Sequence, residues 1–191
     1  MLVSGRHLLI GSLVIVPVAA VAAVVTSSTD PAAKAEPVAM VTAKATLFDL
    51  KGKNVGNAVL TQTPEGVQVA VAAMGLPAGE LAMHIHEKGV CDPKAKFTTA
   101  GAHFNPMGKQ HGLNHEGGAH AGDMPNITVG TGGKAEVSTV NHQISLVKGV
   151  PNSVLDADGS ALIIHAKPDD NVSQPAGDAG DRIVCGVIKA G

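Results

Sequence analysis

The chain has 191 residues, enough for one domain with a sizeable core and an additional N-terminal segment. Its formal net charge of -2 argues against a nucleic-acid-binding surface or a polybasic membrane patch, and the sequence contains neither a P-loop nor a GxGxxG turn. Trp and Tyr are absent, whereas 23 Gly and 11 Pro indicate many turns, so we expect an all-β domain with an aliphatic core.

The N-terminal segment is apolar. Residues 8–25, LLIGSLVIVPVAAVAAVV, carry no charge and have a length between that of a signal-peptide core and that of a membrane-spanning helix. Pro17 and the small residues after it favour a cleavable signal. We predict that residues 1–25 are a signal peptide or an N-terminal membrane anchor and that residues 26–37 are a flexible linker. In either case the remainder is exported to the periplasm, the cell envelope or the medium.

Residues 38–191 are predicted to form the folded domain. Their apolar residues occur in short alternating segments separated by turns rich in Gly, Asn and Asp, which indicates about eight strands. These segments are 41–50, 57–63, 66–74, 81–88, 135–140, 143–147, 160–166 and 182–190. We expect an eight-stranded antiparallel Greek-key β-sandwich or flattened barrel. Two long irregular stretches, 89–126 and 168–181, are predicted to be functional loops.

Histidines with strand spacing indicate a metal site. In the segment LAMHIHEK, His84 and His86 share one face of a strand while Met83 and Ile85 share the other. Strand rise places the Cα atoms of the two histidines about 6.6 Å apart, close enough for both to bind one ion. In SALIIHA, His165 can join the same site from a distant strand. Nitrogen donors of this kind suit copper.

A second group of potential ligands lies in the first long loop. His103, His111, His120 and Asp123 lie among Gly and Pro residues, so a loop folded around an ion can present them without regular secondary structure. Three imidazoles and one carboxylate suit a closed tetrahedral zinc site. Six of the nine histidines lie between positions 84 and 120, a density that indicates ligands more strongly than solvent-exposed residues.

These segments resemble the copper/zinc superoxide dismutase family, particularly its exported bacterial members. The resemblance covers residues 38–191 and rests on HIHEKGVC, AGAHFNP, HAGDMPN, LIIHAKPDD and GDAGDRIVCGVI, in that order. It implies an oxidoreductase that converts superoxide to oxygen and hydrogen peroxide and protects the cell envelope. One copper and one zinc per chain are its implied cofactors.

The resemblance also implies a role for each matching residue. Copper would be bound by His84, His86, His103 and His165. Zinc would be bound by His103, His111, His120 and Asp123. His103 would therefore bridge both ions and take part in proton transfer, and Asp169 would link a copper ligand to a zinc ligand. Arg182 would attract and orient the superoxide anion. Cys91 and Cys185 would form a disulfide.

Several features depart from the eukaryotic pattern of this family or stay open. The loop 168–181 has no lysine, so a steering residue cannot be transferred to it, and the alternatives are Lys88, Lys94, Lys96 and Lys109. His115 and His142 match no ligand position. Both a monomer and a homodimer are compatible with the sequence, as is membrane attachment through residues 8–25. No nucleic-acid partner is expected.

Two other hypotheses compete with the enzyme. A related domain could buffer or deliver metal, but such a domain is expected to lack a copper ligand or the arginine, and this chain has both. A structural β-sandwich with a His-rich insert would explain neither the alternation of His84 and His86 with core residues nor the distant His165. We therefore predict a superoxide dismutase.

Overall fold

The computed structural model describes residues 40–191, and the predictions for residues 1–25 and 26–37 lie outside them. Ten strands and one short 3-10 helix are found in this part of the chain. The strands are β1 (Thr42–Asp49), β2 (Asn54–Thr63), β3 (Gly66–Met74), β4 (Gly79–Leu81), β5 (Met83–His86), β6 (Ile127–Val129), β7 (Lys134–Asn141), β8 (Ala161–His165), β9 (Arg182–Val187) and β10 (Lys189–Ala190). The helix, η1, spans Thr98–Ala100.

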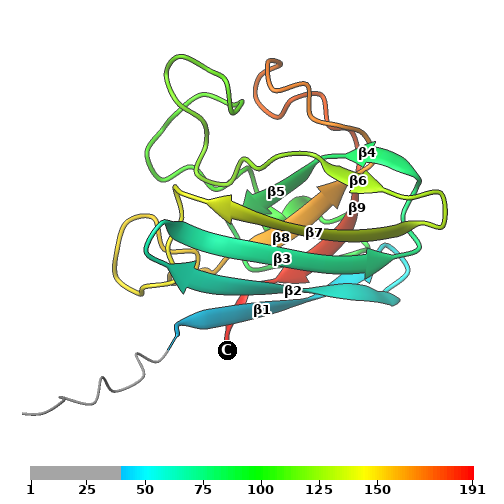
Figure 1. The fold of residues 1–191 in the computed structure, drawn as a ribbon, viewed down its shortest axis with the longest axis horizontal. Helices are drawn as coiled ribbons and strands as arrows, with labels where there is room; N and C mark the ends of the chain where they lie inside the picture. Colours follow the sequence, from blue (N-terminus) through cyan, green and yellow to red (C-terminus); the bar gives the residue numbers. More distant parts are fainter. Residues whose placement is uncertain (1–39) are drawn as a thin grey trace, which may run out of the picture. The chain divides into compact units, whose positions relative to one another are not determined.

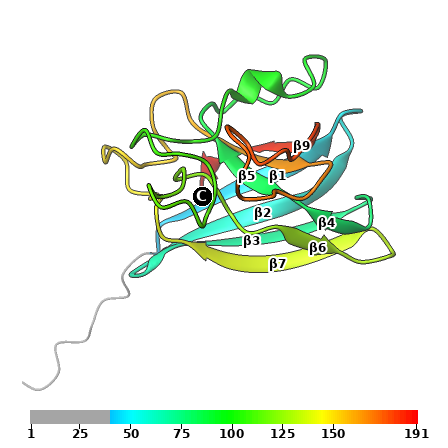
Figure 2. The same cartoon turned by 90° about the horizontal axis from the view of Figure 1, so that it is seen from above.

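The strands form one large antiparallel sheet and one small sheet. The order in the large sheet is β5-β8-β9-β1-β2-β3-β7, with β10 added beside β1, and the small sheet pairs β4 with β6. Figures 1 and 2 show the large sheet curled into two facing layers, with β1, β2, β3 and β7 on one side and β5, β8 and β9 on the other. The predicted all-β, antiparallel barrel-like fold is confirmed.

The core lies between the two layers and is aliphatic, as the composition predicted. In β1 the side chains of Ala43, Ala45 and Leu47 are buried while those of Lys44, Thr46 and Phe48 are not, which is the period of two expected for a strand with one buried face. Met83 and Ile85 of β5 enter the same core. Their position leaves His84 and His86 on the opposite face of β5, toward the long loops.

Three expected strands differ in detail, and one of them, 182–190, is interrupted at Ile188 and forms β9 and β10. The predicted strand 143–147 is reduced to one isolated bridge between Ser145 and Ser153, and the N–H of Leu146 donates to the side chain of Gln62 at 2.8 Å in place of a neighbouring strand. The predicted strand 81–88 is divided between β4 and β5. At the division, the N–H of Ala82 donates to the carbonyl of Lys167.

The loop between β5 and β6 and the loop between β8 and β9 lie at the same edge of the sheet (Figure 1). Among the hydrogen bonds that join them are two at 2.9 Å, in which the N–H of His111 donates to Gln174 and the amide of Gln174 donates to the carbonyl of His111. Among residues 40–191, no helix is long and apolar enough to cross a membrane.

Candidate metal centre

The first group of predicted ligands comes together from two strands and one loop. His84 and His86 lie on β5, His165 ends the neighbouring strand β8, and His103 lies in the following loop, bridged to His86 by backbone pairing. One ligand nitrogen from each of the four lies within 4.8 Å of the other three. All four side chains are buried. We call these four residues the histidine cluster.

The nitrogen atoms that face one another in the histidine cluster have no hydrogen-bond partner. Five buried side-chain polar atoms within residues 40–191 lack a partner, and four of them belong to this cluster. They are Nδ1 of His84 and Nε2 of His86, His103 and His165. A buried polar atom without a partner is costly, so four converging on one point require an explanation. A metal ion bound between them supplies it, and the site fits copper, which prefers imidazole nitrogen donors.

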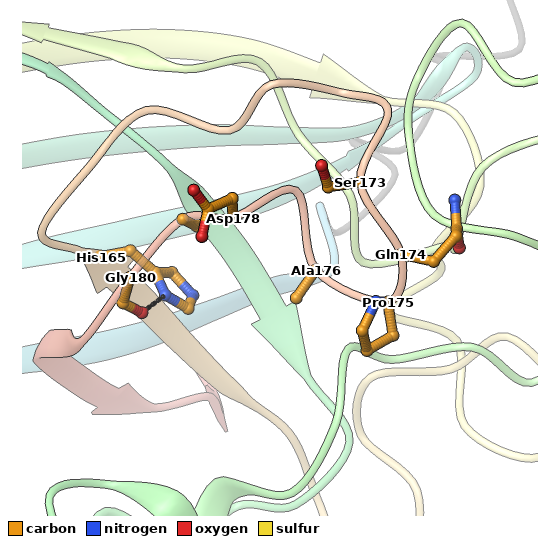
Figure 3. Close-up of a pocket in the computed structure, with 8 residues that line it drawn as sticks. His165, Ser173, Gln174, Pro175, Ala176, Asp178 and Gly180 are labelled. Carbon is orange, nitrogen blue, oxygen red and sulfur yellow. Dashed lines mark hydrogen bonds between the residues drawn. The ribbon is translucent and has the colours of Figure 1, made fainter.

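The opposite nitrogen of three of these rings is held by a protein acceptor. Nδ1 of His86 donates to the carbonyl of Gly101 at 3.0 Å, and Nδ1 of His165 donates to the carbonyl of Gly180 at 3.2 Å (Figure 3). Nε2 of His84 donates to Asp169 at 2.7 Å. These bonds fix the tautomer of each ring so that the free nitrogen points into the cluster, as in metal-binding histidines.

Burial keeps three rings of the histidine cluster, those of His84, His86 and His165, neutral. Desolvation lowers the pKa of His84 to about 4 and that of His165 to about 3, with the nearby histidines adding repulsion. Desolvation also places the pKa of His86 well below its ordinary value, and His103 and Arg182 lower it further. Neutral imidazole is the form that binds a metal. At neutral pH these three rings can therefore bind a metal ion without first losing a proton.

The second group of predicted ligands forms the corners of a small tetrahedron. Oδ1 of Asp123 lies 2.9 Å from Nδ1 of His103, 3.2 Å from Nδ1 of His111 and 3.4 Å from Nδ1 of His120. Nδ1 of His120 lies 3.5 Å from Nδ1 of His103. Zinc bonds of 2.0–2.1 Å in tetrahedral geometry place ligand atoms about 3.3 Å apart, so these separations match the edges of a zinc site. We call these four residues the zinc-type cluster.

Asp123 is oriented by the backbone. Its Oδ2 accepts hydrogen bonds from the N–H groups of Gly112 at 2.9 Å and His120 at 3.1 Å, which leaves Oδ1 facing the three rings. Burial alone would raise the pKa of Asp123, but hydrogen bonds from His103 and His111 outweigh it and hold the pKa well below its usual range. The carboxylate is therefore ionised, as a metal ligand must be.

His111 differs from the rings of the histidine cluster. Desolvation opposes its protonation, but Asp123 and Asp169, which contact its two nitrogens at 3.2 and 3.0 Å, outweigh this and raise its pKa to about 9. In the metal-free protein this ring is therefore a cation at neutral pH, with a proton on each nitrogen. An ion that binds the zinc-type cluster must displace the proton on Nδ1.

Arg182 stands at the wall of a cavity of about 520 Å³ beside the histidine cluster. Its guanidinium donates to two carbonyl oxygens, from Nη1 to Phe97 at 2.8 Å and from Nη2 to Gly101 at 2.7 Å. Burial lowers its pKa, yet a guanidinium stays charged in a protein. The cavity is lined by His86, Glu87, Ala102, His103, Asn105, His120, His165, Pro175, Ala176, Gly180 and Arg182. A fixed cation in a cavity with imidazoles suits a small anion.

The β8–β9 loop covers His165 from another side. A neighbouring cavity of about 340 Å³ is bounded by His165 and by the loop residues Ser173 to Ala176, and Figure 3 shows this loop arching over the ring. Lys167, at the beginning of the loop, lies 3.9 Å from Asp178, and both are exposed. This loop therefore contributes no net positive charge near the cluster.

The predicted disulfide is confirmed. Cys91 and Cys185 are bonded, and Cys185 is fully buried beside Phe97 and Ile163. The bridge ties the loop after β5 to β9, the strand that begins with Arg182. It therefore anchors the segment whose Phe97 and Gly101 carbonyls hold the guanidinium.

The sequence did not reveal every residue of the site. The carbonyl groups of Phe97, Gly101 and Gly180 act through the backbone and leave no signal in the sequence. The side chain of Glu87 accepts a hydrogen bond from the N–H of Ala102, and the side chain of Asn126 bonds to the backbone of Asp169. The spacing of the predicted metal ligands indicates neither residue. His115 and His142 lie apart from both clusters, where Nδ1 of His115 accepts from the N–H of Gly117 and Nδ1 of His142 donates to the carbonyl of Glu65.

Fold and site together define a two-metal β-barrel protein, and comparison with known proteins identifies the family. The family model for copper/zinc superoxide dismutase (SODC) matches residues 54–188. Copper–zinc superoxide dismutase 2 of Aquifex aeolicus is 49% identical over 148 residues, which cover 77% of this chain and 86% of the relative. The chain belongs to the copper/zinc superoxide dismutase family, as the sequence resemblance predicted.

Solved structures of superoxide dismutase-like proteins have the same fold as this chain. The crystal structure of a superoxide dismutase-like protein from Bacillus subtilis superposes with a TM-score of 0.72 at 42% identity, covering 75% of this chain and 96% of that one. The copper/zinc superoxide dismutase of Brucella abortus gives 0.63 at 26% identity, covering 78% and 99%. The family consists of oxidoreductases that use copper and zinc, and the two clusters of this chain can hold both metals.

Proposed function

We propose that this protein disproportionates superoxide at the cell envelope, with copper in the histidine cluster and zinc in the zinc-type cluster. The observation that carries the assignment is the set of four partnerless buried nitrogens converging from His84, His86, His103 and His165. His103 belongs to both clusters, through Nε2 in the first and Nδ1 in the second. Its imidazole would therefore supply one nitrogen to each metal.

Copper, when bound, supplies the one-electron oxidation and reduction by which two superoxide ions and two protons become oxygen and hydrogen peroxide. The residues of the chain attract the anion, orient it and supply protons. Arg182 is the fixed cation of the cavity and can dock the anion by charge-assisted hydrogen bonds while two carbonyls hold its guanidinium in place. Nε2 of His103, a residue that lines the cavity, points into the histidine cluster without a partner and can hold and release one proton.

The family and the disulfide support an exported location, because disulfides persist in oxidising compartments. We propose that the protein works in the periplasm or cell envelope against external superoxide, and that residues 8–25 direct export or anchor the chain. A labelled chain expressed in cells should be found in the envelope fraction. Recovery only in the cytoplasm, with Cys91 and Cys185 reduced, would contradict this location.

The enzymatic assignment is tested with three preparations of the purified protein: metal-free, zinc only, and zinc with one equivalent of copper. Superoxide disproportionation should appear only in the third preparation and should survive removal of free copper by a chelator. If both metals bind tightly and no turnover occurs, the protein is a metal buffer and the proposal fails.

A further inference from the structure

The peptide group that joins Gly101 to Ala102 is held at both ends. Its carbonyl oxygen accepts hydrogen bonds from Nδ1 of His86 at 3.0 Å and from Nη2 of Arg182 at 2.7 Å. Its N–H donates to Oε1 of Glu87 at 3.1 Å. Because a trans peptide group is planar, its C=O and N–H point in opposite directions and turn together. The direction of the shared acceptor therefore depends on where Glu87 holds the N–H.

The side chain of Glu87 is itself fixed against this peptide. The N–H of Glu87 donates to the carbonyl of Ala102 at 3.0 Å, which pairs the two residues through both main chain and side chain. Gly101 has a φ of 77°, and a Cβ at that position would lie 2.5 Å from Oε1 and 2.7 Å from Cγ of Glu87. The carboxylate therefore lies directly against the bare Cα of Gly101. It also lines the same cavity as Arg182.

We propose that Glu87 is a positioning residue that sets the ring of His86 and the guanidinium of Arg182 at the same time. It acts through the Gly101–Ala102 peptide and not on superoxide. A carboxylate that accepts from the N–H of an amide also polarises that amide, which strengthens its carbonyl as an acceptor. The proposal rests on the proposed function, in which His86 binds copper and Arg182 docks the anion.

A purely structural role of Glu87 would have different consequences. If Glu87 only closed the turn after β5, its removal would lower stability and leave the copper environment and anion binding unchanged. The two roles are separated by replacing Glu87 with Ala, which loses the acceptor, and with Gln, which keeps an oxygen acceptor at the same position without the charge. Glu80→Ala, at an exposed position of β4, is the matched control, because it removes a glutamate outside the cavity.

Two readouts are taken on the protein loaded with copper and zinc: the Cu(II) electron paramagnetic resonance spectrum, and the affinity for azide as an anionic probe. We expect Glu87→Ala to change the spectrum and to weaken azide binding about tenfold, the effect of losing roughly one charge-assisted hydrogen bond. Glu87→Gln should keep the wild-type spectrum and bind azide more tightly than Glu87→Ala, because both variants lose the same negative charge and only Gln keeps an acceptor for the N–H of Ala102. Glu80→Ala should match wild type in both.

A third readout needs no metal. In the metal-free protein, Glu87→Ala should speed hydrogen exchange of the Ala102 amide and shift the resonance of the His86 Nδ1 proton. If copper does not bind, the proposed function fails, and these two metal-free measurements still decide the role of Glu87. If Glu87→Ala does not fold, Glu87→Asp, which keeps the charge but is one methylene shorter, replaces it in every measurement. A wild-type spectrum, wild-type azide affinity and an unmoved His86 resonance in the folded variant would overturn the proposal.

Discussion

Nε2 of His84 lies 2.7 Å from Oδ2 of Asp169, and through this bond a ring of the histidine cluster is joined to the zinc-type cluster. The other oxygen of the same carboxylate, Oδ1, lies 3.0 Å from Nε2 of His111. Asn126 holds the backbone of Asp169 by two hydrogen bonds, at 2.8 and 2.9 Å. Together with His103, Asp169 is thus a second connection between the two clusters.

Replacement of Asp169 should therefore weaken zinc binding. In Asp169→Ala, the ring of His111 loses the acceptor that orients it, and zinc affinity should fall about 10- to 100-fold, the usual effect of removing such a partner. The measurement is competition for zinc against a chelator of known affinity. Asp170→Ala is the control, because this neighbouring carboxylate bonds only within its own turn, to Val172 and Ser173. Equal zinc affinity in Asp169→Ala and wild type would contradict the role of Asp169.

Zinc and copper should release protons from different rings. The pKa of His111 is raised to about 9, so at pH 7 the folded metal-free protein carries this proton and zinc must displace it. Zinc affinity should consequently rise about tenfold per pH unit up to about pH 9. Copper binding at pH 7 should release no proton from His84 or His165, because their pKa values are lowered to about 4 and about 3.

Calorimetry in buffers of different ionisation enthalpy measures both quantities. Zinc added to the metal-free protein at pH 7 should release about one proton per ion. Copper added next, to the zinc-loaded protein, should also release about one proton, from Nε2 of His103, because an imidazole that binds two metals holds no proton on either nitrogen. Copper that binds without releasing a proton would show that His103 does not bind both metals.

Much of the fold and site could be predicted because strand periodicity carries the information. His84 and His86 alternate with Met83 and Ile85, and this alternation predicts that the rings lie on the face away from the core. The sequence predicted less well where side chains replace strands as hydrogen-bond partners. Gln62 satisfies the backbone N–H of Leu146, and the apolar segment around it makes only one isolated bridge, from Ser145 to Ser153.

Backbone acceptors are the part of the site that sequence cannot show. The carbonyls of Gly101 and Gly180 select the tautomers of His86 and His165, but any residue type has a carbonyl. Their placement depends on the loop path, which in turn depends on long-range contacts such as the pairing of Gln174 with His111. Spacing arguments identify which residues bind and not how each ring is turned.

Loss of the disulfide should destabilise the protein and loosen the loop that holds Arg182. Cys91 and Cys185 are separated by 94 positions, and in the chain-entropy model closing a loop of that size contributes about 4–5 kcal/mol. We expect the double variant Cys91→Ala, Cys185→Ala to unfold at a clearly lower temperature than wild type, by calorimetry of the zinc-loaded protein. Reduced wild type is the control for the cavity that the alanines leave. An unchanged unfolding temperature in both would contradict the prediction.

Arg182 should control the rate of reaction with superoxide and not the metal content. It is the cation that lines the cavity, and a fixed positive charge in a cavity raises the association rate of an anion about 10-fold or more at low ionic strength. We expect Arg182→Gln to lower the second-order rate constant by about tenfold to a hundredfold and to flatten its dependence on salt. The rate constant of Arg182→Lys should lie between those of wild type and Arg182→Gln. Lysine keeps the charge, but its ammonium cannot donate to the carbonyls of Phe97 and Gly101 in the fixed geometry of a guanidinium.

The comparison needs a variant with the same change in net charge. Lys53→Gln removes an exposed cation from the turn between β1 and β2, outside the cavity, and should leave the rate close to that of wild type. Copper and zinc contents are measured on every preparation, so that a slow variant with empty sites is not mistaken for one that docks poorly. If Arg182→Gln, fully loaded, reacts as fast as Lys53→Gln at low ionic strength, then the anion is oriented by the imidazoles and the metal alone.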